Sequence, residues 1–189
     1  MKRVYSLRNI ILIALISIFC GLIFLGIGYL RDDVLIPFSL VISTRELNFF
    51  PTANAVAQGP WVLGAALVGD LFRAPGSALL GQAVSSVVEC FIGGVSGIRG
   101  MLSGILEGFG TEAGFACSKY RHYTLKSFGL GSFFTTLITF AYDVITKGYF
   151  KFSLLSLIIA FVVQFASIFL ISYNLTQAIR GYLKRSQIL

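Results

Sequence analysis

Long apolar stretches separated by short polar breaks follow one another along the whole chain. A bilayer core about 30 Å thick needs roughly 20 mostly apolar residues per helix. Six stretches approach this length, at about 9–29, 56–72, 75–93, 98–118, 126–146 and 152–177. The breaks at 73–76 and 93–97 are rich in Gly and Pro and are typical of turns. The pattern predicts an all-α integral membrane protein in which residues 1–189 form a single domain of six transmembrane helices.

The connection between the first and second stretches, about 31–55, is the longest. It contains Pro37 and Pro51, yet its edges are too apolar for a simple linker. We expect a partly ordered outer lid or a short re-entrant helix there. The first stretch follows a basic start, as a signal peptide would, but it is long for one and no A-x-A-like cleavage site follows it. We therefore interpret it as a retained helix.

Charged residues are scarce and unevenly distributed. Hydrophobic residues make up 56% of the 189 positions and charged residues 12%, whereas about a quarter of an average soluble domain is charged. This composition excludes a soluble enzyme domain, a disordered chain and a nucleic-acid module. With the N-terminus in the cytoplasm, ten of the 15 Lys and Arg residues fall on the inner side. By the positive-inside rule, the chain is predicted to be a multi-pass protein of the plasma membrane with both termini cytoplasmic.

Five carboxylates fall inside the predicted spans: Asp70, Glu89, Glu107, Glu112 and Asp143. Each would cost about 2.5–3.5 kcal/mol at the bilayer centre, so we expect them to face the bundle interior or to lie near helix ends. At about 1.5 Å of rise per residue, three of them could converge on a cavity open to the outside, namely Glu89, Glu107 and Asp143. Asp70 and Glu112 lie deeper, where they could face cytoplasmic basic residues. The alternative for every acid is a packing pair or a helix-end contact.

Aromatic residues are predicted at the same outer level. Trp61 and Tyr142 could either anchor the protein at the membrane interface or bind a ligand. Carboxylates and aromatic faces together suit a flat ring that is cationic or bears an amine. We see no comparable outer cluster of Arg for an anionic solute. Gly108, next to Glu107, belongs to a glycine stripe that indicates either helix packing or a wall against a ligand.

Several motifs of catalysis and nucleotide binding are missing. The chain has no G-x-x-x-x-G-K-[ST] loop, no H-E-x-x-H and no G-x-S-x-G. Its three cysteines are far apart and form no C-x-x-C pair. The sequence therefore predicts a protein that is not an enzyme and that carries neither a metal nor a cofactor of its own.

Particular residues resemble a known family. These are Arg73-Ala74-Pro75-Gly76-Ser77-Ala78-Leu79-Leu80, Val88-Glu89, Gly104-Ile105-Leu106-Glu107-Gly108-Phe109-Gly110-Thr111-Glu112, Lys119-Tyr120-Arg121 and Tyr142-Asp143. They resemble the YkoE-type substrate-binding (S) component of energy-coupling factor (ECF) transporters. Glu is common in that family's pattern where this chain has Gln82, and Gln where it has Glu107.

The resemblance implies a six-helix membrane protein that captures thiamine, or its hydroxymethylpyrimidine precursor, from the outside. It also implies a separate transmembrane coupling subunit and two cytoplasmic ATPases. We predict that the solute contacts Glu89, Glu107, Asp143, Tyr142, Trp61 and Gly108. A supporting or coupling role is predicted for Glu112, Gln82 and Asp70.

Two alternatives come from other classes of protein. The first is a stand-alone, proton-coupled carrier of a small cationic or amine-bearing solute, with Glu107 or Glu112 as the proton relay. The second is a structural membrane subunit that binds no solute, in which the acids are packing pairs.

Overall fold

The computed structural model describes residues 6–120 and 124–185, and within these ranges every regular element is a helix. The α-helices are α1 Leu7–Leu30, α2 Ile36–Ile42, α3 Phe50–Trp61, α4 Leu63–Phe72, α5 Ser77–Ile92, α6 Gly97–Cys117, α7 Leu125–Thr146, α8 Leu154–Ser167 and α9 Tyr173–Arg185. The π-helical turns are η1 Arg31–Leu35 and η3 Ile168–Ser172, and η2 Tyr149–Lys151 is a 3-10 turn. Arg121, which ends one of the family motifs, lies outside the described residues.

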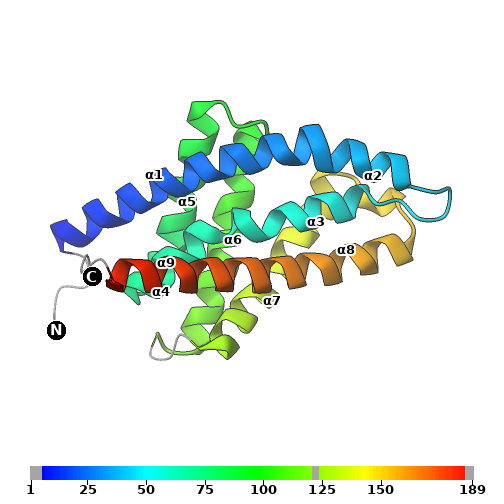
Figure 1. Ribbon diagram of the computed structural model, residues 1–189. Coiled ribbons are helices and arrows are strands. Elements are labelled where there is room, and N and C mark those ends of the chain that lie inside the picture. The colour runs from blue at the N-terminus through cyan, green and yellow to red at the C-terminus, as the bar shows by residue number, and fades with distance from the viewer. Residues whose placement is uncertain (1–5, 121–123, 186–189) are drawn as a thin grey trace.

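In the described ranges these elements form six helical segments, and three of the segments are made of two or more elements that follow one another with at most one residue between them. α1, η1 and α2 run on as one helix of 36 residues (Figure 1). Four segments in the described ranges are long and apolar enough to cross a membrane: Leu7–Ile42, Phe50–Phe72, Leu125–Thr146 and Leu154–Tyr182. α5 and α6 complete the set. The chain is an all-helical membrane bundle, and the crossing of the membrane by all six segments stays a prediction.

The predicted lid or re-entrant helix at 31–55 is wrong. Residues 31–42 continue the first helix, residues 50–61 form α3, and only 43–49 are not helical. Neither proline breaks its helix. Pro37 follows the widened turn η1, in which the Ile36 N–H donates to the Arg31 carbonyl five residues back, and Pro51 lies in the first turn of α3, where no N–H donor is needed.

Close packing of α5, α6 and α7 forms one part of the bundle, with α1 lying against α5 and α3 against α8 (Figure 1). Glycines allow this approach. A Cβ at Gly110 or Gly114 would collide with the α7 backbone at Thr135 or Gly131. A Cβ at Gly104 would collide with Ser86 of α5. The packing interpretation of the α6 glycine stripes is thus confirmed on two faces of the helix.

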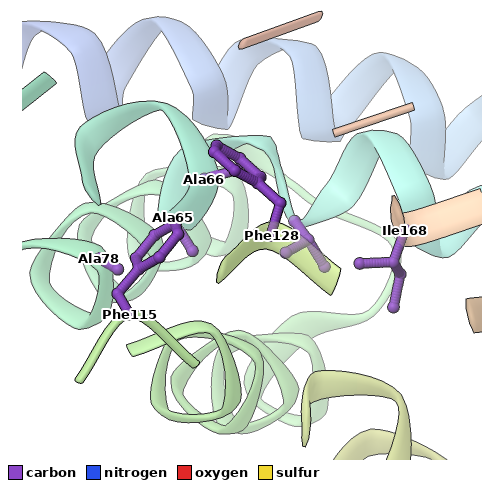
Figure 2. Packing of buried hydrophobic residues seen from close by; sticks show 7 residues of the cluster. Ala65, Ala66, Ala78, Phe115, Phe128 and Ile168 are labelled. Carbon is purple, nitrogen blue, oxygen red and sulfur yellow. The ribbon is translucent and has the colours of Figure 1, made fainter. Parts of the chain in front are cut away.

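An apolar cluster joins α4, α5, α6, α7 and η3. Phe115 of α6 and Phe128 of α7 meet edge to face with ring centres 5.3 Å apart, and Ile168 packs against the same group (Figure 2). Alanines complete the cluster, and their small side chains let the helices come close (Figure 2). None of these residues lines the cavity described below.

We predict that Gly114→Ala lowers the free energy of unfolding by about 1–3 kcal/mol, because the added methyl group must push α6 away from α7. Gly26→Ala is the matched control, since its Cβ meets no atom within 4 Å and alanine favours helix by about 0.5–1 kcal/mol. Unfolding of both variants in the same detergent measures the difference. Equal stability of the two variants would contradict the close approach of α6 and α7.

Candidate functional site

A cavity of about 350 Å³ lies among η1, α2, α3, α5, α6 and α7. Its volume is in the range of small-molecule sites. The lining combines charged, polar and aromatic side chains, and it comprises Arg31, Ile36, Phe50, Asn54, Gln58, Trp61, Ser86, Glu89, Val95, Ser96, Arg99, Gly100, Ser103, Glu107, Tyr142, Asp143, Thr146 and Lys147. The structure therefore brings together five of the six residues predicted to contact the solute.

Glu107 of α6 is buried in the cavity wall and fully hydrogen-bonded. Its Oε1 accepts from Gln58 Nε2 at 2.9 Å and from Ser103 Oγ at 3.0 Å, and its Oε2 accepts from Gln82 Nε2 at 2.6 Å. These donors come from α3, α6 and α5. Three donors offset the cost of placing a carboxylate away from water. Glu107 is thus fixed in one orientation by three helices.

Gln82 of α5 also holds the break between α3 and α4. Its Nε2 donates to the Trp61 carbonyl at 2.7 Å, and its Oε1 accepts the Ala65 N–H at 2.9 Å. In an unbroken helix that N–H would donate to that carbonyl, four residues back. The Gln82 amide is therefore inserted into the helix at Val62, and the predicted supporting role of this residue has a physical basis.

Glu89 of α5 is buried and only half satisfied. Its Oε2 accepts from Trp61 Nε1 at 3.2 Å. Its Oε1 is buried and has no hydrogen-bond partner among the described residues. The Arg31 guanidinium lies over the Trp61 ring, with its carbon 5.0 Å from the ring centre. The site thus contains an acceptor without a donor, beside an aromatic face that already holds a cation.

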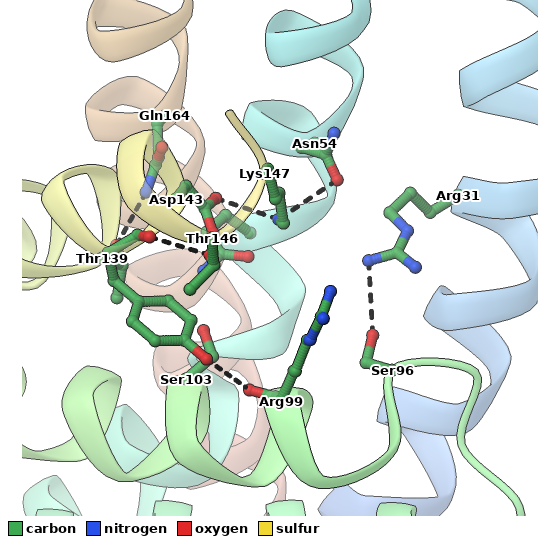
Figure 3. Close-up of polar contacts among 12 residues, drawn as sticks. Arg31, Asn54, Ser96, Arg99, Ser103, Thr139, Asp143, Thr146, Lys147 and Gln164 are labelled. Atoms are coloured by element: carbon green, nitrogen blue, oxygen red, sulfur yellow. Dashed lines mark hydrogen bonds and ion pairs between the residues drawn. The ribbon is translucent and has the colours of Figure 1, made fainter. Parts of the chain in front are cut away.

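Asp143, near the end of α7, is buried and paired with a cation. Lys147 Nζ lies 3.0 Å from Asp143 Oδ2 and 3.4 Å from Asn54 Oδ1 (Figure 3). Tyr142 points its hydroxyl at α6, where it donates to the Arg99 carbonyl at 3.3 Å. These contacts tie the end of α7 to α3 and to the start of α6.

We expected no outer cluster of Arg residues for an anionic solute, but the structure brings two Arg residues and one Lys to the cavity. Arg31, Arg99 and Lys147 all line the cavity. They come from η1, α6 and the residue after α7, so only the fold brings them together. The three cations match the formal charge of the three carboxylates in the same wall. The site as a whole is charge-balanced rather than acidic.

Four of the predicted residues lie outside the cavity lining: Gln82, described above, and Gly108, Glu112 and Asp70. Gly108 faces α5, where a Cβ would lie 3.0 Å from both Gln82 Cβ and Leu79 Cα. The prediction that Gly108 forms a wall against the ligand is therefore wrong. The one-residue step from Glu107 to Gly108 turns the helix by about 100°, which takes Gly108 from the cavity to the helix interface.

Glu112 caps a helix instead of lining the cavity. Its carboxylate accepts the backbone N–H groups of Gly76, Ala78 and Leu79 at 2.6, 3.0 and 3.4 Å, together with the Tyr120 hydroxyl at 2.6 Å. It thereby satisfies donors at the start of α5 that have no partner within the helix. This geometry gives Glu112 a structural role.

Of the two acids predicted to lie deeper, Asp70 is the one that pairs with basic residues in the described structure. Its carboxylate lies 3.2 Å from Arg180 of α9 and 3.6 Å from Arg73. The contact ties the end of α4 to the C-terminal helix, away from the cavity.

Several lining residues were missed by the sequence interpretation. Ser103 precedes Glu107 by one helical turn, and this spacing was a usable signal. Gln58 and Asn54 share a face of α3 at a spacing of four residues, but they lie in a segment partly assigned to the outer loop. Among the described residues, no group of three or more His, Cys, Asp or Glu residues is placed to hold a metal ion.

The fold and this cavity define the class of the protein. A solved structure of an S-component of an ECF transporter superimposes with a TM-score of 0.87, at 26% sequence identity, and covers 97% of this chain and 88% of that one. The protein is an ECF transporter S-component, a multi-pass membrane protein and not an enzyme.

The chain belongs to the family described as the permease component of the ABC-type cobalt transport system, which it matches over residues 8–138. It is also similar to YkoE of Bacillus subtilis (strain 168), which carries the provisional name of HMP/thiamine permease protein. The two are 29% identical over 141 residues, which cover 75% of this chain and 71% of YkoE.

We predict that Gln82→Leu lowers the free energy of unfolding by about 2–4 kcal/mol. The substitution removes a donor from Glu107, and it leaves the Trp61 carbonyl and the Ala65 N–H without their side-chain partner. Gln164→Leu is the matched control. Gln164 is equally buried but donates to a single hydroxyl, that of Thr139. Unfolding in detergent should place Gln82→Leu well below Gln164→Leu, and the reverse order would contradict the role of the inserted amide.

Proposed function

We propose that this S-component binds thiamine, or its hydroxymethylpyrimidine precursor, from the outer side of the plasma membrane. The observation that carries the proposal is the buried Glu89 Oε1, which has no donor among the described residues and lies in the wall of the cavity. An unsatisfied buried acceptor costs about 1–3 kcal/mol, and a ligand N–H would remove that cost. The similarity to YkoE supports the choice of ligand.

The chemistry of the wall suits an aminopyrimidine ring. An amino group of the ring would donate to Glu89 Oε1, and the flat face of the ring, or the cationic thiazolium of thiamine, would lie on Trp61. The position of the Arg31 guanidinium over Trp61 supports the use of that face by a cation. Asp143 and Glu107 line the same cavity, and Tyr142 adds a second aromatic side chain. Arg31 would leave the Trp61 face when the ligand enters.

ECF S-components work with an ECF module, and we propose that this chain captures the ligand while the module supplies the energy for transport. Six spanning segments would place both termini in the cytoplasm. A transmembrane coupling subunit and two cytoplasmic ATPases would then supply the energy for release of the ligand on the inner side. Movement at η1, which carries Arg31 at the cavity wall, would control access from the outside.

Calorimetric titration of the purified chain in detergent tests the binding proposal. We expect saturable binding of thiamine or hydroxymethylpyrimidine, weakened about tenfold or more by Glu89→Gln, which loses the charge that a ligand N–H would meet. Glu46→Gln is the control, because Glu46 is exposed in the 43–49 connection, outside the cavity lining. Absence of saturable binding, or equal binding by both variants, would refute the proposed site.

Uptake measurements test the proposed partners. In cells that express this chain with a coupling subunit and both ATPases, we expect accumulation of labelled thiamine that stops when ATP hydrolysis by the ATPases is abolished. Cells that express the chain alone should bind the ligand without accumulating it. Accumulation by the chain alone, driven by a pH gradient, would favour the proton-coupled carrier instead.

A further inference from the structure

Three basic side chains converge on the cavity from separate elements. Arg31 comes from η1, Arg99 from the first turn of α6, and Lys147 from the residue that follows α7. Figure 3 shows the Arg99 side chain extending from α6 toward the space between Lys147 and Arg31. Arg31 and Lys147 are each paired with a carboxylate, so among the described cations of the lining Arg99 is the one whose charge is left to attract an anion.

The three cations differ in what they already bind. The Arg31 guanidinium bonds to Asp32 at 2.6 Å and reaches Ser96 at 3.5 Å. Lys147 is paired with Asp143. For the Arg99 guanidinium, by contrast, there is no hydrogen bond or ion pair to any of the described residues, although its backbone carbonyl is held by Tyr142. Arg99 therefore presents a fixed backbone and an uncommitted charged fork to the cavity.

Within the site the acidic side chains are more deeply buried than the basic ones. The carboxylates of Glu89, Glu107 and Asp143 belong to residues that are only 3–5% exposed. The Arg31 and Lys147 side chains are 11% and 32% exposed, and Arg99 is exposed as well. A ligand that follows this gradient places its amine-bearing or cationic ring inward and an anionic group at the opening.

We propose that Arg99, Lys147 and Arg31 form an anion subsite that takes the phosphate of a phosphate monoester whose ring occupies the Trp61–Glu89 part of the cavity. The proposal rests on the function proposed above. Thiamine and hydroxymethylpyrimidine each carry an alcohol that a phosphate can esterify, and an arginine fork matches two phosphate oxygens at once. The phosphate of such an ester carries a charge of about −1.5 to −2 at pH 7, which the basic side chains at the opening can oppose.

Titration of the purified chain with thiamine and with thiamine monophosphate tests the subsite. We expect the monophosphate to bind about tenfold more tightly at low salt, and this preference to shrink as salt screens the exposed cations. Arg99→Gln should weaken binding of the monophosphate about tenfold more than binding of thiamine. Arg99→Lys keeps the charge but not the fork, and should give an intermediate loss.

Arg45→Gln is the matched control, because it removes the same charge from the exposed 43–49 connection, outside the cavity lining. It should leave the preference for the monophosphate unchanged. If thiamine binds but the monophosphate binds no more tightly, or if Arg99→Gln weakens both ligands equally, the anion subsite is refuted and the proposed function stands. If thiamine, its monophosphate and hydroxymethylpyrimidine all fail to bind the unmodified chain, both proposals fail.

Discussion

The side-chain amide of Gln82 is the contact on which the geometry of the cavity depends. It replaces one backbone hydrogen bond between Trp61 and Ala65, and with its remaining N–H it fixes Glu107. In a bilayer, water cannot satisfy the backbone groups that a helix break sets free, so another helix must supply the partner. The same residue therefore permits the break, orients the helix that carries Trp61, and positions a buried acid.

Irregular backbone needs polar partners, and two of the irregular points, the α3–α4 break beside Trp61 and the turn η1, lie at the cavity. Pro60 has no N–H for the Val56 carbonyl, and Ser167 donates to that carbonyl at 2.7 Å instead. The widened turn η1 carries Arg31 into the cavity wall. Regular packing is concentrated elsewhere, at the α6 glycines and the aromatic cluster around Phe115. The bundle thus separates a close-packed apolar part from the polar part that lines the cavity.

The local pattern of apolar and charged residues was sufficient to predict the number of helical segments and the burial of the acids. It was not sufficient to predict which residues of different segments meet. Apolar length predicted where the helices run, and charge scarcity predicted that Glu89, Glu107 and Asp143 would turn inward, as they do. Pro37 led to a wrong prediction. In a sequence, a proline indicates the end of a helix, but here the π-helical turn η1 accommodates Pro37 and the helix continues. The basic side chains of Arg31, Arg99 and Lys147 are far apart in sequence, and only the bundle places them in one wall.

The balance of charge in the cavity accounts for the survival of three buried acids in a membrane bundle. Lys147 neutralises Asp143 directly, and hydrogen bonds from neutral side chains satisfy Glu107. Glu89 differs, because Trp61 satisfies one oxygen while the other has no donor in the part of the chain that the structure describes. An open acceptor lowers stability, and Glu89 is the one acid of the cavity lining with a buried oxygen that lacks a donor among the described residues. In the proposed function, the N–H of a ligand would supply the donor that this oxygen lacks.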